Sequence, residues 1–450
     1  MWTIGIDIGT TTISAVVMRT DVRSIEKAYT LANDCFLLSE RPWEKIQDPE
    51  SILRKAAGLL EEILKEYPDV DGIGLTGQMH GIVYLDETGT HISPLFTWQD
   101  GSGSQKCLEG RNICEYVEQK YQAKLYTGYG MATYLYHVVT GQVPEGAAGV
   151  CTIMDYLGMY LTGRKTPLIH VSNAASLGLF DAQQGRFQSE LLEAMGADPA
   201  LLPQVAPGME LLGTYHGIPV SVAIGDNQAS FLGSVEQVEN TLLVNMGTGG
   251  QISVFSKNYC NIEGIETRPF MERDYLLVGS SLCGGRAYAL LEGFFRSYAR
   301  ALGADDGEQY EVMDRLLREQ SVSEHLKVVT AFSGTRQNPE KRGEIHGIGT
   351  ENFTPAGLIR GVLEGMSQEL YDMYAQMIPH LEKLPDKIVA SGNGIRKNHH
   401  LQEIVSGQFS LPIQLSDQKE EAACGAAVSA VLFLKKKDKN HHEKSDRQND

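Results

Sequence analysis

The sequence predicts a two-domain α/β protein in which both domains follow one plan. Its 450 residues exceed what one hydrophobic core usually serves, which favours two domains. A strand, a Gly-Thr turn and a second strand occur as TIGIDIGTTTISAVVM from Thr3 and return as TLLVNMGTGGQISVF from Thr241. Apolar runs at helical spacing alternate with short buried strands between and after these copies. We therefore expect domains at 1–239 and 240–434, although Gly-Thr turns between strands are also common in unrelated proteins.

Three long helices are predicted from their ends and their apolar periodicity. Asp48 is a typical N-cap before Pro49, and Tyr67-Pro68 ends that run. Thr354-Pro355 opens a second helix that ends at Pro379. The third, CGAAVSAVLFL, starts at Cys424 and is rich in small residues. Residues 435–450 contain no apolar side chain, so we expect a disordered polar tail there.

Two further segments show a strand that runs into a glycine-rich turn. GIGLTGQMHG, from Gly72, is followed by a second short strand, IVYLD. KIVASGNGI, from Lys387, has the same form. Turns at strand ends are common places for ligand contacts, so these two segments are candidates for a site.

The composition limits the kinds of partner that the protein is expected to bind. The formal net charge of −18 disfavours nucleic acid as a partner, and no apolar run is long enough for a membrane crossing. The N-terminus lacks a basic, cleavable leader, and the seven cysteines form neither CxxC pairs nor a zinc pattern. We expect a cytoplasmic protein with free thiols. The composition leaves a homodimer open.

Three glycine-rich turns could hold phosphate oxygens through backbone N–H groups: Gly9–Thr12, Gly247–Gly250 and Gly392–Gly394. None is a Walker A loop, and none is a GxGxxG turn that opens a helix. One such turn is more often a plain hairpin. Three together favour a nucleotide ligand.

Two aspartates stand where carboxylates are costly or functional. Asp7 ends an apolar strand, where it could bind Mg²⁺ through water or accept N–H groups of the next turn. Asp226 follows the apolar strand of PVSVAIGDNQAS. It could be a helix N-cap, or a base that accepts a proton from an attacking hydroxyl.

Two loops combine the groups that bind a polyol. GQMHG (77–81) and TWQDG (97–101) carry amides, an aromatic ring, a carboxylate and an imidazole. His80 could equally be a structural imidazole, and Trp98 could be a core aromatic residue.

The motifs IDIGTTT, GQMHG, TWQDG, SNAAS, IGDNQAS, NMGTGG and SGNGIRKN, in this order, resemble the FGGY carbohydrate kinases from about Thr3 to Lys435. The resemblance implies two ribonuclease-H-like (actin-like) domains with ATP in the cleft between them. It also implies transfer of a phosphoryl group to the terminal primary hydroxyl of a ketose. Within the family, TGYGMATYLYH and SNAASLGLFD are similar to segments of sedoheptulokinases, and xylulokinases or other pentulokinases are the alternative.

The resemblance also implies roles for individual residues. Asp226 would be the base, and Asp7 would hold Mg²⁺ through water. The phosphates of ATP would contact Thr10, Thr11, Gly247, Thr248 and Gly249, and the adenosine would lie near Gly392, Asn393 and Asn398. The sugar would contact Gln78, Met79, His80, Trp98, Asp100, Asn173 and Asn227.

The sequence departs from the family pattern at two places. Ser14 stands where many members have Arg or Lys, so a direct cation at the transferred phosphate is in doubt. SGNGIRKN lacks a double glycine, which puts the choice of nucleotide in doubt. A remote alternative is a non-catalytic, actin-like nucleotide switch, although such a protein has no need for the GQMHG and TWQDG loops.

Overall fold

The computed structural model describes residues 1–304, 307–320, 324–335, 338–416 and 420–446. The chain forms two compact units. The first contains Met1–Glu236, Arg268–Asp274 and Gln418–Asp450, and the second contains Gln237–Thr267 and Tyr275–Asp417. The first change of unit lies three residues before the predicted boundary. Residues 268–274 and the C-terminal segment differ from the prediction, because they pack with the first unit.

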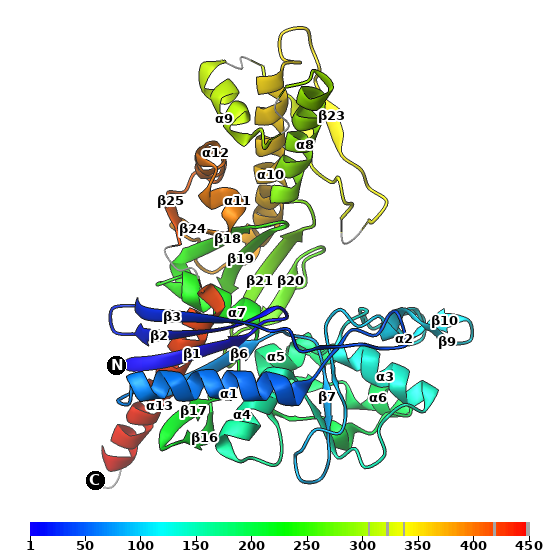
Figure 1. Cartoon of the computed structure of the whole chain (residues 1–450), viewed down its shortest axis with the longest axis vertical. Coiled ribbons are helices and arrows are strands. Elements are labelled where there is room, and N and C mark those ends of the chain that lie inside the picture. The colour runs from blue at the N-terminus through cyan, green and yellow to red at the C-terminus, as the bar shows by residue number, and fades with distance from the viewer. Residues whose placement is uncertain (305–306, 321–323, 336–337, 417–419, 447–450) are drawn as a thin grey trace. The chain divides into compact units, whose positions relative to one another are not determined.

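A six-stranded sheet lies at the centre of the first unit (Figure 1). The predicted N-terminal hairpin is confirmed, since β1 pairs with β2 in antiparallel register and with β6 in parallel register. In order across the sheet the strands are β16 (Leu211–Tyr215), β17 (Ile218–Ser221), β6 (Gly72–Gly77), β1 (Trp2–Ile8), β2 (Thr12–Arg19) and β3 (Ser24–Ala32).

Successive side chains of β1 point to opposite faces of the sheet, and the two faces have different neighbours. The Thr3 hydroxyl donates to the carbonyl of Ala427 in α13 at 3.0 Å, so Thr3 and Gly5 face that helix. Ile4 and Ile6 point the other way and are fully buried. The first predicted helix is confirmed as α1 (Pro49–Glu66), whose N-cap is Asp48.

The last predicted helix is confirmed as α13 (Glu421–Asp446), which packs on β1, β6 and α7 (Asp226–Ser234). A Cβ at Gly5 would lie 1.9 Å from the Ala423 carbonyl oxygen, and one at Gly74 would lie 1.8 Å from that of Ala426. Glycines in the strands and alanines in the helix therefore allow close backbone contact. The expected disorder from residue 435 is not what the structure has, since α13 runs on to Asp446. A helix that is already nucleated extends at little cost through polar residues. Residues 447–450 lie outside the described part.

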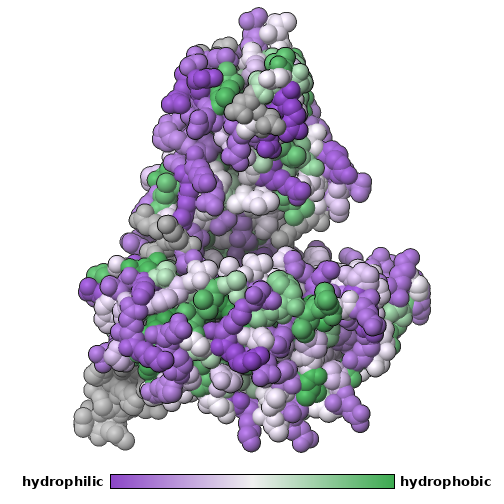
Figure 2. Space-filling view, in the orientation of Figure 1, coloured by the Kyte–Doolittle hydropathy of each residue, from purple (hydrophilic) through white to green (hydrophobic). Residues whose placement is uncertain are grey.

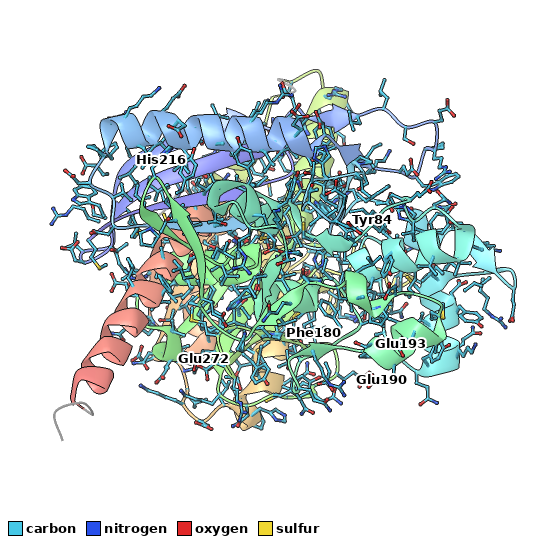
Figure 3. All side chains as sticks on the ribbon, turned by 90° about the horizontal axis from the view of Figure 1, so that it is seen from below. Tyr84, Phe180, Glu190, Glu193, His216 and Glu272 are labelled. Carbon is cyan, nitrogen blue, oxygen red and sulfur yellow. The ribbon has the colours of Figure 1, made fainter. Side chains whose placement is uncertain are left out.

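A second core fills the remainder of the first unit. Tyr84 lies inside it (Figure 3), and its hydroxyl is 3.0 Å from Nδ1 of the buried His137. The helices here are α2 (Ile113–Tyr121), α3 (Gly130–Thr140), α5 (Val171–Ser176) and α6 (Ser189–Ala194), with 3₁₀ turns at Ser102–Ser104 and Pro199–Leu201. Helix α4 (Ile153–Thr162) packs instead on α1 and on β16, β17 and β6 of the central sheet. This part of the unit also has a three-stranded sheet of β4 (Phe36–Leu37), β5 (Ile46–Gln47) and β8 (Leu95–Phe96). Short strand pairs accompany it: β7 (Val83–Leu85) and β11 (Gly149–Cys151); β9 (Lys106–Leu108) and β10 (Arg111–Asn112); β12 (Leu168–His170) and β15 (Gln204–Ala206); β13 (Phe180–Asp181) and β14 (Arg186–Phe187).

The sheet of the second unit repeats the plan of the first. Its order is β20 (Glu266–Pro269), β21 (Tyr275–Ser281), β19 (Gly250–Ser256), β18 (Thr241–Met246), β24 (Lys387–Ser391) and β25 (Ile413–Leu415). From β21 to β25 the order and directions match those from β3 to β17. Asn245 pairs across to Gln251 and Ser391, as Asp7 pairs to Ser14 and Thr76. The duplication read from the sequence is therefore present in the structure.

In the described part of the second unit, five helices accompany this sheet. They are α8 (Gly285–Ala301), α9 (Tyr310–Glu319), α10 (Pro355–Met377), α11 (Asn393–Arg396) and α12 (His399–Phe409), with β22 (Lys327–Val329), β23 (Glu344–His346) and 3₁₀ turns at Val238–Asn240 and Ile378–His380. The prediction for α10 is confirmed, including Thr354 as its N-cap. Among the described helices, none has the length and apolar character that crossing a bilayer requires.

Candidate active site

Two carboxylates interact on one face of the first unit's sheet. Asp7 is the last polar residue of β1 and has the same parity as Thr3 and Gly5, so it points to the face that α13 and α7 cover. Asp226 is the first residue of α7, and its charge acts on Asp7. Both side chains keep some solvent exposure although protein atoms surround them. The pair is therefore accessible to a ligand.

The backbone around Asp226 is tightly held. Gly225 is the N-cap of α7, which corrects the alternative that Asp226 is itself the cap. The Gly225 amide donates to the Ser172 hydroxyl at 3.0 Å, and a Cβ at Gly225 would lie 2.7 Å from the terminal carbon of Met79. Backbone amides of Asn227 and Met79 donate to the Asp226 carboxylate. These contacts fix the carboxylate at the start of the helix.

Both carboxyls bind protons more strongly than ordinary aspartates. Burial raises the pKa of Asp226 to about 6, against the opposing effects of Arg268 and the two backbone donors. Burial also raises the pKa of Asp7 to about 7, with further increases from the negative charges of Asp226 and Glu420. Near neutral pH such a pair can accept a proton or take up a cation.

A hydrogen-bond chain connects the first glycine-rich turn with both polyol-type loops. The indole Nε1 of Trp98 donates to the Thr10 hydroxyl at 2.9 Å, and Thr10 Oγ1 lies 3.4 Å from Gln78 Oε1. Gln78 Nε2 donates to Gln47 Oε1 at 2.8 Å, and Gln47 Nε2 donates to the Thr10 carbonyl at 2.9 Å. Trp98 is 47% exposed, so one ring face is open to a ligand. The structure thus brings together residues predicted for phosphate and for sugar.

His80 occupies a strained turn next to α5. Its φ of 75° is unusual for a residue with a side chain. The Nδ1–H group donates to the Ser176 carbonyl at 2.5 Å, which makes Nε2 the acceptor nitrogen of the neutral ring. The ring stacks on Tyr129 with 4.4 Å between centroids. The turn therefore holds the imidazole in one orientation.

Two predicted sugar contacts are fully buried. Asp100 Oδ1 accepts from the Ser102 amide and the Thr133 hydroxyl at 3.0 and 3.2 Å. Asn173 Nδ2 donates to Thr152 Oγ1 and Asp155 Oδ2, both at 2.9 Å. Side chains with no exposed surface do not fit a direct contact with sugar. Asn173 and the Oδ1 atom of Asp100 are hydrogen-bonded inside the protein, whereas Asp100 Oδ2 is buried and has no hydrogen-bond partner among the described residues.

The other predicted residues of the first unit lie at the surface of the same region. Asn227 is the second residue of α7 and is half-buried. Thr11 is exposed, and its carbonyl accepts from the Asn33 amide at 2.8 Å. The Asn33 side chain donates to the Gly9 carbonyl at 2.8 Å. Asn33 thus holds the Gly9–Thr12 turn at both ends.

The predicted nucleotide residues of the second unit converge on the N-terminus of α8. The Gly285 amide donates to the Gly247 carbonyl at 2.9 Å, and the next amide along donates to the Thr248 carbonyl at 3.0 Å. A Cβ at Gly284 would lie 2.3 Å from the Gly249 backbone, and one at Gly392 would lie 2.6 Å from the Met246 carbonyl oxygen. Only glycines permit this approach, and backbone N–H groups at such a place suit phosphate.

The asparagines predicted near adenosine differ in their placement. Asn393 begins α11, directly after Gly392 with its φ of 87°. Asn398 is the N-cap of α12, and its side chain accepts from the Leu401 amide at 3.0 Å. Asn398 therefore has a structural role that the sequence reading did not foresee.

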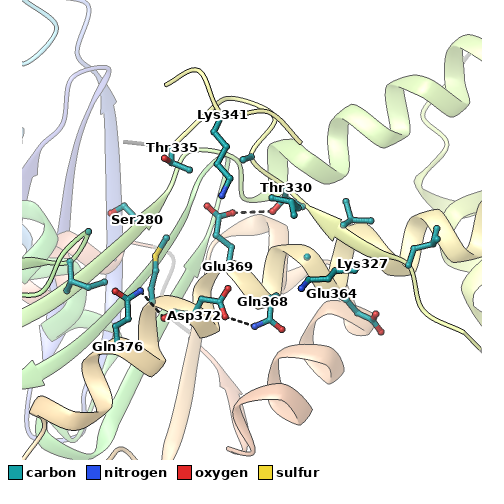
Figure 4. A pocket seen from close by; sticks show the side chains of 18 of the residues that line it. Ser280, Lys327, Thr330, Thr335, Lys341, Glu364, Gln368, Glu369, Asp372 and Gln376 are labelled. Carbon is teal, nitrogen blue, oxygen red and sulfur yellow. Dashed lines mark hydrogen bonds between the residues drawn. The ribbon is translucent and has the colours of Figure 1, made fainter. Parts of the chain in front are cut away.

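A separate cavity of about 620 Å³ lies in the second unit between α10 and β22 (Figure 4). Thr330 donates to Glu369 at 3.2 Å across it, and Gln368 donates to Asp372 at 2.6 Å. No residue predicted for a site lines this cavity.

Several residues of the site were missed by sequence reasoning. Ser172, Gln47, Tyr129 and Arg268 all act on predicted residues through the contacts above. Ser172 and Tyr129 lie within segments that carried the family resemblance, which is the one signal that could have found them. Gln47 and Arg268 stand in no motif.

Comparison with known proteins identifies the family and the fold of this chain. The family models described as the N-terminal and C-terminal domains of the FGGY family of carbohydrate kinases match residues 2–233 and 242–433. A sedoheptulokinase from Homo sapiens is 28% identical over 95% of this chain and 96% of its own length, and a xylulose kinase from Staphylococcus xylosus is 24% identical over 96% and 90%. The crystal structure of Plasmodium falciparum glycerol kinase with ADP has a TM-score of 0.78 at 18% identity, covering 96% of this chain and 90% of that one. The fold class of two ribonuclease-H-like domains is thus confirmed. This chain belongs to the FGGY family of carbohydrate kinases.

Proposed function

We propose that this kinase transfers the γ-phosphoryl group of ATP to the terminal primary hydroxyl of a ketose, with sedoheptulose as the substrate and sedoheptulose 7-phosphate as the product. The observation that carries the proposal is the Asp7–Asp226 pair beside the GQMHG and TWQDG loops. The alternative of a non-catalytic switch is not favoured, because the chain belongs to a family of carbohydrate kinases.

Asp226 is the base in this proposal. The sugar hydroxyl loses its proton to the Asp226 carboxylate as the hydroxyl oxygen attacks the γ-phosphorus atom. A pKa of about 6 supports this role, because the carboxylate is ionised at neutral pH yet more basic than an ordinary aspartate. The Asn227 and Met79 amides keep the carboxylate in place.

Asp7 is the proposed holder of Mg²⁺ through water. Asp7 lies near a second carboxylate, Asp226, whose negative charge raises its proton affinity, and such a pair suits an oxygen-ligated cation, which would neutralise the charge. Mg²⁺ when bound offsets the charge of the phosphate oxygens. Ser14, opposite Asp7 in β2, offers no cation for that purpose.

Backbone groups are the proposed ATP contacts in the second unit. Gly247, Thr248 and Gly249 meet the N-terminus of α8, where a Cβ at Gly284 would clash with the Gly249 backbone. Thr10 and Thr11 are the proposed phosphate contacts in the first unit. Near adenosine we retain Gly392 and Asn393, while Asn398 acts through the start of α12.

The sugar is proposed to stack on Trp98 and to bond to His80 and Asn227, while Gln78, which is buried and bonded to Gln47 and Thr10, positions the first turn. The exposure of Trp98 and the fixed orientation of His80 support this arrangement. Asp100 and Asn173 act as positioning residues, because their side chains are buried. Met79 contributes its backbone amide to the base.

A substrate panel tests the proposal. ADP release is measured with sedoheptulose, xylulose, ribulose and glycerol at matched concentrations, with MgATP in excess. Sedoheptulose should give the highest kcat/KM, by at least about tenfold. A preference for a pentulose would replace sedoheptulose with the alternative that the Staphylococcus xylosus relative supports. Absence of phosphorylation of any sugar would refute the kinase mechanism.

A further inference from the structure

Helix α5 carries polar side chains at buried positions of the first unit. Ser172, Asn173 and Ser176 are at most 6% exposed, and His170, the residue before the helix, is fully buried. Hydrophilic residues on the outer surface, of which Figure 2 shows many, are solvated and need no further explanation. In the interior each polar group needs a hydrogen bond, and an apolar residue would cost less. The contacts of these four side chains therefore indicate what the helix does.

The start of α5 holds the backbone next to the proposed base. The Ser172 hydroxyl accepts from the amide of Gly225, which directly precedes Asp226. The hydrogen of that hydroxyl must then go to another acceptor, and His170 Nδ1 lies 2.7 Å away. The Ser172 amide donates to the same Nδ1 at 3.2 Å. His170 thus fixes the direction of the Ser172 hydroxyl, and the hydroxyl holds Gly225.

This arrangement requires a neutral His170. Burial lowers the pKa of His170 to about 3, so the ring is uncharged at neutral pH and can accept through Nδ1. The ring hydrogen is then on Nε2, which is buried and has no hydrogen-bond partner among the described residues. A buried donor without a partner destabilises a fold. The bond from the Ser172 hydroxyl to Nδ1 therefore explains this histidine better than a contribution to stability does.

The end of α5 holds the imidazole that is proposed to bind the sugar. The His80 amide donates to the Ser176 hydroxyl at 3.3 Å, and His80 Nδ1–H donates to the Ser176 carbonyl. The Ser176 hydroxyl in turn donates to the Asn173 carbonyl at 2.7 Å. The Asn173 side chain anchors the middle of the helix to Thr152 and Asp155 of the α4 N-terminus. One short, anchored helix therefore supports both functional side chains.

We propose that Ser172 and His170 are positioning residues for the transfer step, and that α5 fixes the base relative to the imidazole of His80. The inference rests on the proposed function, because it takes Asp226 as the base and His80 as a sugar contact. Ser172 acts through Gly225 and does not touch the substrate. A misplacement of about 1 Å can cost about 100-fold in rate, so the loss of its hydroxyl should be visible in turnover.

The first test combines Ser172→Ala with Asp226→Asn. Alone, Ser172→Ala should lower kcat by about 10–100-fold and leave the KM values of sugar and ATP within about threefold. In the Asp226→Asn background it should lower the residual turnover by less than about threefold, because a residue that acts through the base has nothing left to position. Losses that multiply would overturn the proposal, and so would wild-type kcat in Ser172→Ala.

Ser93→Ala is the matched control. Ser93 is buried, and its hydroxyl accepts from the Tyr84 amide at 2.9 Å, as that of Ser172 accepts from Gly225. Ser93→Ala should lower the melting temperature about as much as Ser172→Ala does, yet keep kcat within about twofold. Circular dichroism shows that both variants are folded. Equal losses of kcat in the two variants would assign Ser172 to stability alone and overturn the proposal.

The two ends of α5 should change different kinetic parameters. Ser176→Ala should raise the sugar KM by about three- to tenfold and keep kcat within about twofold, because it loosens His80 and not the base. His170→Asn should keep kcat within about threefold, because Oδ1 takes the place of Nδ1 and asparagine is a good N-cap, whereas His170→Leu should lose kcat as Ser172→Ala does. A fall of kcat in Ser176→Ala, or equal losses in the two His170 variants, would contradict the proposed roles.

Failure of the proposed function gives a different result. Near-normal turnover of Asp226→Asn would refute the base itself and this inference with it. An inactive Asp226→Asn beside a fully active Ser172→Ala would refute the positioning role alone.

Discussion

Asp226→Asn should abolish most turnover and, at the same time, stabilise the fold. The amide keeps the size of the side chain and can still accept from the Asn227 and Met79 amides, but it cannot take up a proton. Loss of a general base costs about 10²–10⁴-fold in kcat, or about 3–5 kcal/mol of transition-state stabilisation.

The gain in stability follows from the raised pKa. A shift from 3.8 to about 6 makes ionised Asp226 unfavourable in the folded state. Each unit corresponds to about 1.4 kcal/mol, and partial exposure reduces the total to about 1–3 kcal/mol. The cost is present above pH 6 and fades as pH falls toward 4, because the folded wild type is then protonated and the unfolded chain becomes so. The melting temperature of Asp226→Asn should therefore exceed that of wild type by a few degrees at pH 8, and the difference should shrink at pH 5.

Coupled ADP-release assays and thermal unfolding at pH 5 and 8 measure both effects. Asp86→Asn is the control, because Asp86 is a half-buried residue before a turn, in another loop, and its carboxylate accepts from Thr88 and Thr90. It should keep wild-type kcat and gain no stability. Turnover of Asp226→Asn within threefold of wild type, or a lower melting temperature at pH 8, would refute the reasoning.

Three further predictions concern the same region. Trp98→Ala should raise the sugar KM by about 10–100-fold and leave the ATP KM within about twofold, whereas Trp98→Phe should raise the sugar KM less. Michaelis kinetics in both substrates measure this, and a change confined to the ATP KM would contradict the stacking role. Gly225→Ala forces a Cβ to within 2.7 Å of Met79, so it should lower the free energy of unfolding by about 1–3 kcal/mol and also lower kcat. Gly58→Ala is the control, because its Cβ meets nothing within 4 Å, and in urea unfolding it should raise the free energy of unfolding by about 0.5–1 kcal/mol. In the pH profile of kcat/KM, the acid limb should have an apparent pKa near 6–7 that belongs to the carboxylate pair. Asp7→Asn should shift the acid limb of its residual activity to lower pH, and an unchanged limb would show that the two carboxyl groups are uncoupled.

Local patterns predicted the fold well where one segment contains all the information. The hairpins at Gly9 and Gly247, and the helices opened by Asp48 and Thr354, depend on turn and cap chemistry within a few residues. The same strands with the same partners in both units bear out the duplication. Where α13 packs could not be predicted, because its small residues meet glycines more than 300 positions earlier.

The sequence indicated which residue types lie in the candidate site, but it did not indicate which of those residues are exposed to a ligand. Asp7 and Asp226 do interact, and Trp98 does join Thr10, yet Asp100 and Asn173 are buried. A carboxylate or amide in a polar loop has the same appearance whether it faces a ligand or a neighbouring helix. Only the tertiary fold separates the two cases.

The packing of α13 against β1 has a consequence for biosynthesis. The first unit contains Met1–Glu236 but also includes α13, which begins at Glu421. At ~5–20 residues per second, about 10–40 s pass between the synthesis of residue 236 and that of Glu421. Until then Gly5 and Gly74 lack the helix that covers them, so the first unit cannot complete its packing before α13 has been made.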